Sequence, residues 1–187
     1  MNIKNVLFTI LLITLFLATS TLAIFTAKKI TTTHTHSADN PDFFMTNTLY
    51  TKFNREGELH NCIRTKKLTH FATNNAYLFK KPRITIYNKN EKPWKITAKK
   101  GKSKNGKTEV HLHGNVKIIR EAGINNTDFD IATNALTVYP DVKFAETKLP
   151  VTIVQSGNIT KAVGAELDFK TGLLKLLSKI KAIYQVN

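Results

Sequence analysis

The residues after about position 42 predict an all-β sandwich or roll. Apolar and polar side chains alternate in many short stretches, which is the pattern of strands with one buried face. The stretches also form a loose internal repeat, in which a polar turn joins two of them. Short strands at regular intervals, with little helical periodicity between them, are typical of this fold class.

Four units carry the repeat, over residues 62–87, 94–119, 129–154 and 161–186. Each unit has residues that favour a turn near its middle: Asn74–Asn75, Lys104–Gly106, Tyr139–Asp141 and Lys170–Gly172. Each expected strand has one apolar face, so stacking successive units would bury a continuous channel or core.

The stretch VHLHGNVKIIRE in the second unit shows how alternation assigns the faces. One side of the expected strand carries Val110, Leu112, Gly114, Val116 and Ile118. The other side carries His111 and His113, which therefore face solvent. No other His, Cys, Asp or Glu has a spacing that would complete a ligand set, so we expect no metal site and no cofactor.

The last stretch, GLLKLLSKIKAIYQV, fits two structures. As a strand it would place these residues on one side: Leu174, Leu176, Ile180, Ala182, Tyr184 and Val186. Leucines and isoleucines at three- and four-residue spacing, with Lys175 and Lys179 opposite them, also fit a basic amphipathic helix lying on a membrane. We prefer the strand because the segment continues the register of the repeat.

The N-terminal segment is of another kind. Residues 6–27 carry no charge and form a run long enough to cross a bilayer as a helix. A cleaved signal peptide is the competing interpretation, because Thr21–Ala23 offers a small-residue cleavage pattern. The apolar run continues past that pattern, so we expect an uncleaved transmembrane anchor, although the flanking lysines fix its orientation poorly.

Residues 28–42 are polar and rich in threonine, and they predict a tether between the anchor and one domain over residues 43–187. The whole chain carries a net charge of +15. A field of that sign attracts polyanions such as phosphorylated lipid, nucleic acid or acidic polysaccharide. The only cysteine, Cys62, excludes an internal disulfide.

The sequence does not predict an enzyme. It has no Ser/His/Asp arrangement, no paired carboxylates in an expected cleft and no glycine-rich phosphate loop. A binding or transport function is therefore expected.

Four sequence segments carry a resemblance to a known family: FNREGEL, KKPRITIYNKNEKPWKITAKKG, VHLHGNVKI and the terminal LLSKIKAIYQV. Together with the anchor and the tether, they resemble the LptC family of lipopolysaccharide export proteins over nearly the whole chain. The most specific features are Gly57 after an acidic residue, the proline-led strand followed by Trp94, and the terminal apolar strand.

The resemblance implies a twisted, open β-jellyroll of two antiparallel sheets in the periplasm of a Gram-negative bacterium. Residues 1–5 would be cytoplasmic, and residues 6–27 would cross the inner membrane once. Family members lie beside an ABC transporter and pass lipopolysaccharide to a periplasmic bridge protein of the same fold. No catalytic activity is implied.

Lipopolysaccharide has acyl chains that need an apolar trough and phosphates that need cations near its rim. By the resemblance, Phe79 and Leu174 occupy groove-lining positions. Six further candidates lie on expected apolar faces: Ile84, Ile86, Val116, Ile118, Val151 and Ile153. For all of these except Leu174, simple core packing is an equally good explanation.

Open rolls also expose edge strands, and these can dock partners by strand addition. The resemblance places the bridge protein at the last strand, on Ile180, Ala182, Ile183, Tyr184 and Val186. It places the transporter near the first strands, at Phe53, Gly57 and Leu59.

The alternative is a membrane-anchored module that binds an anionic polymer, either nucleic acid or acidic polysaccharide. Single-strand binders place aromatic and basic residues on one surface, and Phe79, Tyr87 and Trp94 lie near lysines in this sequence. Alternation, however, puts Ile84 and Ile86 opposite Arg83 and leaves few aromatics beside the cations. We therefore expect no nucleic acid partner.

Overall fold

The computed structural model describes residues 3, 12–21, 40–103 and 108–183, which belong to two compact units, Met1–Ser37 and Ala38–Asn187. Residues 12–21 in the first unit are helical. Among the described residues, no helix has the length and apolar character needed to span a membrane. Most of the expected anchor lies outside the described residues, so the anchor stays a prediction.

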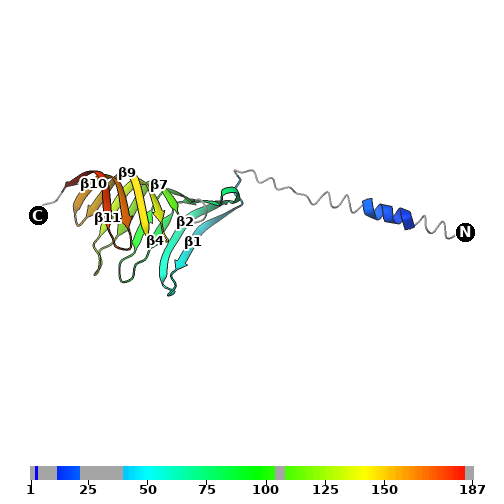
Figure 1. The fold of residues 1–187 in the computed structure, drawn as a ribbon, viewed down its shortest axis with the longest axis horizontal. Helices are drawn as coiled ribbons and strands as arrows, with labels where there is room; N and C mark the ends of the chain where they lie inside the picture. Colours follow the sequence, from blue (N-terminus) through cyan, green and yellow to red (C-terminus); the bar gives the residue numbers. More distant parts are fainter. Residues whose placement is uncertain (1–2, 4–11, 22–39, 104–107, 184–187) are drawn as a thin grey trace. The chain divides into compact units, whose positions relative to one another are not determined.

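The second unit is an antiparallel β-sheet, which confirms the all-β prediction (Figure 1). Its described strands are β1 (Phe43–Phe53), β2 (Leu59–Phe71), β3 (Ala76–Lys80), β4 (Arg83–Ile86), β5 (Trp94–Thr97), β6 (Lys100–Ser103), β7 (Val110–Arg120), β8 (Phe129–Tyr139), β9 (Phe144–Gln155), β10 (Asn158–Asp168) and β11 (Leu174–Ile183). One short 3₁₀ turn, Ala72–Asn74, joins β2 to β3.

The pairings reduce these strands to an up-and-down meander. β3 and β4 pair with β2 in one unbroken register, since Lys80 lies opposite Lys67 and Arg83 opposite Arg64. They are therefore two halves of one long strand that is interrupted at Lys81. β5 and β6 form a second interrupted strand in the same way, and every long strand pairs with its neighbours in the sequence.

Irregular residues lie in the middle of the long strands. Positive φ angles occur at Asn47, Lys81, Asn115, Gly164 and Lys179. The pairing register also shifts once between each two successive strands from β7 to β11. A bulge bends a strand without ending its pairing, so these positions bend the sheet along one line, which we call the crease.

The crease divides the sheet into two layers. The first layer contains β4 and β5 with residues 48–53, 59–64, 116–120, 129–133, 151–155, 158–162 and 180–183. The second layer contains β3 and β6 with residues 43–46, 67–71, 110–113, 135–139, 144–148, 165–168 and 174–178.

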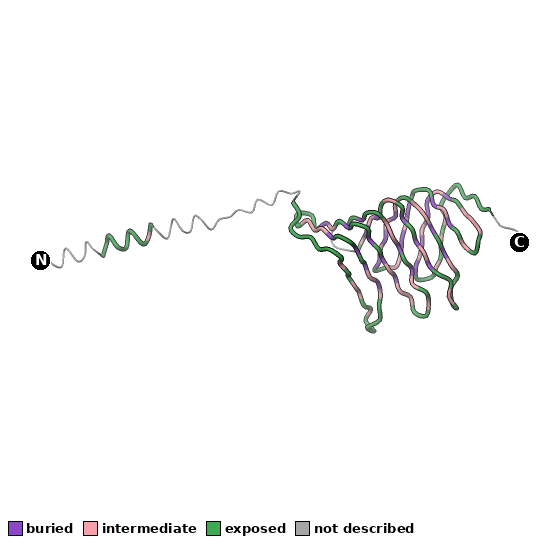
Figure 2. The backbone as a smooth tube through the Cα atoms, turned by 180° about the vertical axis from the view of Figure 1, so that it is seen from behind, coloured by how far each residue is buried: buried purple, intermediate pink, exposed green. Residues whose placement is uncertain are grey.

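The prediction of two separate sheets needs correction, because hydrogen bonding joins all the described strands into one sheet. The bulges bend the strands at the crease, and the pairing continues on both sides of it. Two layers therefore arise from one sheet folded over its own apolar face, and Figure 2 shows the buried segments along the strands of both layers.

The two layers meet again at the strand ends away from the crease. Trp94 Nε1 donates a hydrogen bond of 3.1 Å to the Phe169 carbonyl, and Asn61 Nδ2 donates one of 3.3 Å to the Pro140 carbonyl. Lys52 forms an ion pair of 2.8 Å with Asp141. These partners belong to strands or turns that are not neighbours in the sheet, so their contacts hold one layer against the other.

The C-terminal segment is strand β11, which pairs with β10 from Leu174 to Ile183. The strand prediction is therefore confirmed as far as Ile183, and the helix alternative is wrong there. Tyr184 and Val186 lie outside the described residues.

Candidate functional site

The inner face of the first layer carries an unbroken row of six isoleucines. Cross-strand pairing places these residues side by side in six successive strands: Ile63, Ile84, Ile96, Ile118, Ile131 and Ile153. All six are buried. Tyr50 of β1 lies opposite Ile63 and continues the row toward one end of the sheet.

The inner face of the second layer carries a matching row: Met45, Leu68, Phe79, Gly101, Leu112 and Leu136. Phe79, one of the expected groove residues, is in this row. The two rows line one apolar interior, because their buried members belong to a single hydrophobic cluster.

The expected groove residues are therefore all directed inward, but they do not line an open groove along its length. Phe79, Ile84, Ile86, Val116, Ile118, Val151 and Ile153 are buried in the core, and Leu174 packs against it while half-buried. Of these eight, Phe79 borders a hollow that opens to the surface. Core packing accounts for the others in this structure.

The interior opens at the β1 end of the sheet. A hollow of about 230 Å³ lies there between the two rows, and its lining includes Met45, Tyr50, Leu68 and Phe79. Thr48 also lines this hollow, and its Oγ1 is buried with no hydrogen-bond partner among the described residues. An unsatisfied buried hydroxyl costs about 1–3 kcal/mol.

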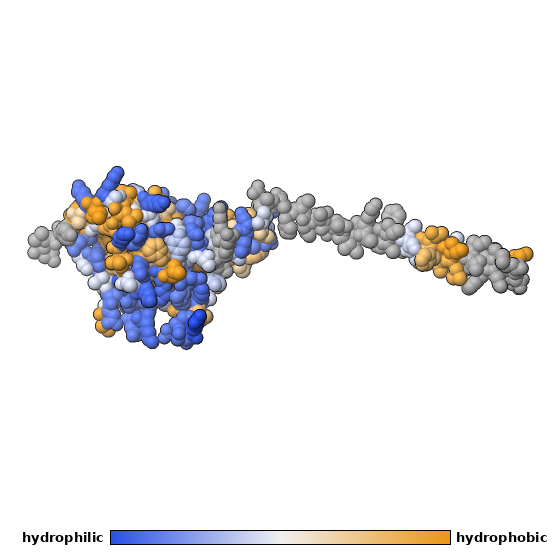
Figure 3. All heavy atoms as spheres, in the orientation of Figure 1, coloured by the Kyte–Doolittle hydropathy of each residue, from blue (hydrophilic) through white to orange (hydrophobic). Residues whose placement is uncertain are grey.

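The opposite end of the sheet is β11, whose other edge has no partner among the described strands. Ile180 is 59% exposed and Ile183 is 52% exposed, and Ala182 between them is exposed as well. Figure 3 shows apolar residues within the hydrophilic surface of the part that holds β10 and β11. Ile180, Ala182 and Ile183, which were expected to contact the bridge protein, thus lie together on one exposed sheet edge.

The residues expected at the transporter edge lie together at the hairpin between β1 and β2. Phe53 and Leu59 face each other across the strands and are 57% and 44% exposed. Gly57 shapes the turn that joins them, with a φ of +80°. The sequence identified this apolar pair, although nothing in the structure shows which partner covers it.

Sequence reasoning missed the rest of β1 as a second sheet edge. Phe43, Phe44, Met45 and Leu49 are all exposed there, and among the described strands β1 pairs only with β2. The stretch FFMTNTLYTKF is apolar enough to indicate a strand, but it lies before the first repeat unit. Both ends of the sheet therefore expose apolar side chains.

The histidine pair lies outside this interior. His111 Nδ1 is 3.1 Å from Thr137 Oγ1, and His113 is exposed on the same outer face. The prediction that both face away from the core is confirmed. Within the part of the chain that the structure describes, no three His, Cys, Asp or Glu side chains gather to hold a metal ion.

The aromatic residues that suggested nucleic acid binding are not available as a stacking surface. Trp94 is fully buried and Phe79 nearly so, while Tyr87 is half-buried beside Cys62. Base stacking needs exposed rings next to the cations, so the structure disfavours this alternative.

Comparison with solved structures supports the fold. The structure is similar to the crystal structure of LptH, described as the LptA-homologous periplasmic component of the conserved lipopolysaccharide transport device from Pseudomonas aeruginosa. The TM-score is 0.52 with 8% sequence identity, and the match covers 67% of this chain and 95% of that chain. At this identity the likeness shows the jellyroll-like fold alone.

Comparison of the sequences supplies the family. No curated protein matches the chain. A family model, described as "LptC: Lipopolysaccharide-assembly, LptC-related", matches residues 9–185 and thus nearly all of the sequence. The chain therefore belongs to the LptC-related family of lipopolysaccharide-assembly proteins, and its role lies in lipopolysaccharide transport.

Proposed function

We propose that this chain is an anchored periplasmic carrier that accepts lipopolysaccharide from an inner-membrane ABC transporter and passes it to a bridge protein of the same fold. The observation that carries this proposal is the apolar interior, which opens beside β1 and continues along two rows toward β11. It offers acyl chains a path from one sheet edge to the other.

Acyl chains enter between the two rows at the β1 mouth. Each contact between facing isoleucine, leucine and phenylalanine side chains is then exchanged for a contact with a methylene group, which buries apolar area at a similar free energy per Å². The crease allows the layers to part without loss of the sheet's hydrogen bonds, because pairing runs along each layer. The interior can therefore be a packed core when empty and a lipid path when filled.

The two sheet edges supply the docking sites. A strand with a free edge offers backbone N–H and C=O groups for strand addition, and both edges carry exposed apolar side chains. The transporter docks at the hairpin of Phe53, Gly57 and Leu59. The bridge protein docks along β11 at Ile180, Ala182 and Ile183, and the predicted contacts at Tyr184 and Val186 extend that edge.

The anchor keeps the carrier beside the transporter. Residues 6–27 cross the inner membrane once, with residues 1–5 in the cytoplasm, residues 28–42 as a tether and residues 43–187 in the periplasm. The support is the uncharged run and the family. A mature chain that begins at Ile24 by mass spectrometry would remove the anchor from this account but leave the carrier role intact.

Transfer between purified proteins tests the proposal. The full chain in lipid nanodiscs is loaded with radiolabelled lipopolysaccharide, and the bridge protein is added in solution. We expect the label to move to the bridge protein with a rate that rises with bridge concentration. Label that stays on the anchored chain, or leaves it equally fast without the bridge protein, would contradict the handover.

A further inference from the structure

The outer face of the crease carries a group of cations that the transport path does not use. We define the cationic patch as Arg64, Lys67, Lys80, Lys81, Arg83 and Lys100. All six are exposed, and none of their side chains forms an ion pair with a carboxylate among the described residues. They lie on β2, β3, β4 and β6 and at the break between β3 and β4.

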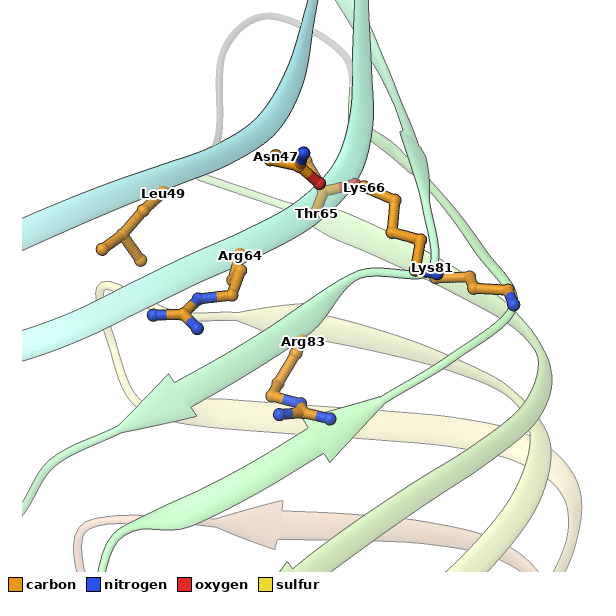
Figure 4. Close-up of a pocket in the computed structure, with 7 residues that line it drawn as sticks. All are labelled: Asn47, Leu49, Arg64, Thr65, Lys66, Lys81 and Arg83. Atoms are coloured by element: carbon orange, nitrogen blue, oxygen red, sulfur yellow. The ribbon is translucent and has the colours of Figure 1, made fainter.

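The sheet sets these charges directly against each other. Arg64 lies opposite Arg83, and Lys80 lies opposite Lys67 on one side and Lys100 on the other. Figure 4 shows Arg64, Arg83 and Lys81 around one hollow of the outer face. Like charges at directly opposed positions destabilise a sheet, so solubility alone does not explain the arrangement, which fits an anionic partner.

The surface between the cations is hollowed. Three shallow depressions of about 490, 700 and 370 Å³ adjoin one another, since Lys81 borders all three, and no acidic residue lines any of them. Exposed apolar side chains lie among them: Leu49 in the first and Leu78 in the second. Lysine also stacks on an aromatic ring here, with Lys67 Nζ 4.9 Å from the centre of the Phe44 ring.

The patch borders the point where the chain enters the domain. Phe44 and Thr46 near the start of β1 lie opposite Thr69 and Lys67 of β2. A segment that leads back toward the anchor therefore joins the domain beside these cations. Basic residues with aromatic and aliphatic neighbours are suited to an anionic lipid surface.

We propose that the cationic patch is a docking surface for the anionic headgroups of the membrane in which the chain is anchored. Phosphates of several lipids lie in the adjoining hollows, each between two opposed cations, while Phe44 and Leu78 contact the interface. The patch thereby turns the domain relative to the membrane. This inference rests on the anchor of the proposed function but not on the transfer of lipopolysaccharide.

Lysine reactivity of the full chain tests the patch. Nanodiscs of phosphatidylcholine alone are compared with nanodiscs that also contain phosphatidylglycerol, and acetylation rates are read for each lysine by mass spectrometry. We expect Lys67, Lys80, Lys81 and Lys100 to react at least about threefold more slowly on the anionic discs. High salt should remove the difference, because the Debye length falls to about 3 Å at 1 M. Lys92 and Lys170, which are exposed elsewhere, should not change.

Matched variants separate the patch from general charge. The double variant Lys80→Gln and Lys100→Gln should lose the protection at Lys67 and Lys81, whereas Lys92→Gln with Lys170→Gln should keep it. Equal rates on the two kinds of disc would overturn the proposal. So would protection that appears only with purified lipopolysaccharide or only with single-stranded DNA. If residues 6–27 do not anchor the chain, the chain will be lost from the phosphatidylcholine discs. The lysine reactivities on the anionic discs can still be measured in that case, so the two failures are distinguishable.

Discussion

Trp94 is the side chain that most directly holds the two layers together. It is fully buried, its Nε1 donates to the Phe169 carbonyl, and its ring lies 5.5 Å from the ring of Phe129. The Arg120 guanidinium lies 4.2 Å from the Trp94 ring centre. The strand β5 is thereby fixed to the turn after β10, which is not its neighbour in the sheet.

Trp94→Phe should keep much of the ring packing but remove the indole donor. Asn88 Nδ2 still donates to the same carbonyl at 2.6 Å, so we expect a loss of about 1–2 kcal/mol in the free energy of unfolding. Trp94→Ala should lose about 3–5 kcal/mol because it also leaves a cavity. Urea unfolding followed by circular dichroism measures both, with the exposed Phe44→Leu as a control. A loss for Trp94→Phe as large as that for Trp94→Ala would contradict the assigned role.

Asp42 and His70 fasten the start of β1, with Nδ1 of the histidine 2.8 Å from the carboxylate. Burial alone would raise the pKa of Asp42, but the hydrogen bond and charge of His70, with nearby backbone N–H groups, outweigh it and hold the pKa below its ordinary value of 3.8. At pH values around the folded and unfolded pKa of Asp42, the unfolded chain therefore binds more protons than the folded chain. The stabilisation is present above the unfolded pKa and is lost as pH falls through the folded pKa.

Carbon-13 NMR titration of the Asp42 carboxyl group measures this effect. We expect a midpoint below 3.8 in the natural chain and a higher midpoint in His70→Ala. His60→Ala, which removes a histidine at the opposite end of β2, should leave the Asp42 midpoint in place. An unchanged midpoint in His70→Ala would show that the contact does not set this pKa.

A bend within a strand requires glycine where the φ angle is positive and a neighbouring side chain occupies the place of a Cβ atom. Gly164 in β10 has a φ of +79°, and an added Cβ would lie 2.9 Å from Leu177 Cδ1 of β11. Gly57 has a φ of +80° with no atom within 4 Å of that position. The two glycines therefore separate the cost of the backbone angle from the cost of the contact.

Gly57→Ala should lose about 1 kcal/mol of stability from the backbone angle alone. Gly164→Ala should lose a further 1–3 kcal/mol, roughly, because Leu177 must move from the crease. Thermal or urea unfolding of the two variants gives the comparison. Equal losses of stability in the two variants would mean that Leu177 moves aside at no cost. The contact between Gly164 and β11 would then not limit the position of that strand.

The edge strand β11 should dock the bridge protein through its backbone. Ile183→Pro removes one donor and disturbs the ladder, so we expect the affinity for the bridge protein to fall at least about tenfold, while Ile183→Val changes it less than about twofold. Isothermal titration or surface plasmon resonance measures both. If Ile183→Pro instead weakens membrane association and leaves bridge binding intact, the edge is not the docking site.

Alternation in the sequence was sufficient to assign faces on one side of the crease but not across it, because the inward residues of β2 change from Ile63 to Leu68 and those of β8 from Ile131 to Leu136. It placed Val116 and Ile118 inward and the two histidines outward, because a side-chain period of two depends only on the extended backbone. The crease could not be predicted in this way. Most of its bulges become visible only when two strands are paired. Gly114 inside a strand pattern is a sequence signal for the bulge at Asn115, but Lys179 has no such signal.

The same limit applies to the candidate site. The apolar residues of the interior were identified one strand at a time, but their alignment into two rows depends on the register of nine strand pairings. The basic surplus was evident from composition, whereas its concentration on the outer crease follows from Arg64 lying opposite Arg83 and Lys67 opposite Lys80. The helix alternative for the last segment was settled by its pairing with β10, a long-range contact that local periodicity does not contain.

The β domain is one folded sheet with cations on its outer crease, and we propose that its apolar interior is a lipid path and that its two end strands are docking edges. In the proposed function, lipopolysaccharide acyl chains lie between the two layers. Photo-crosslinking tests this most directly, with a small diazirine-bearing aliphatic residue placed at Phe79, at Ile118 or at His111 during active transport. Circular dichroism confirms that each variant folds.

We expect Phe79 and Ile118, on the inner rows of the second and first layers, to capture lipopolysaccharide, and His111 on the outer face not to capture it. Capture at Phe79 should precede capture at positions near β11 when the lipid load is started in a pulse. Equal labelling at all three positions, or labelling at His111 alone, would contradict a path between the layers.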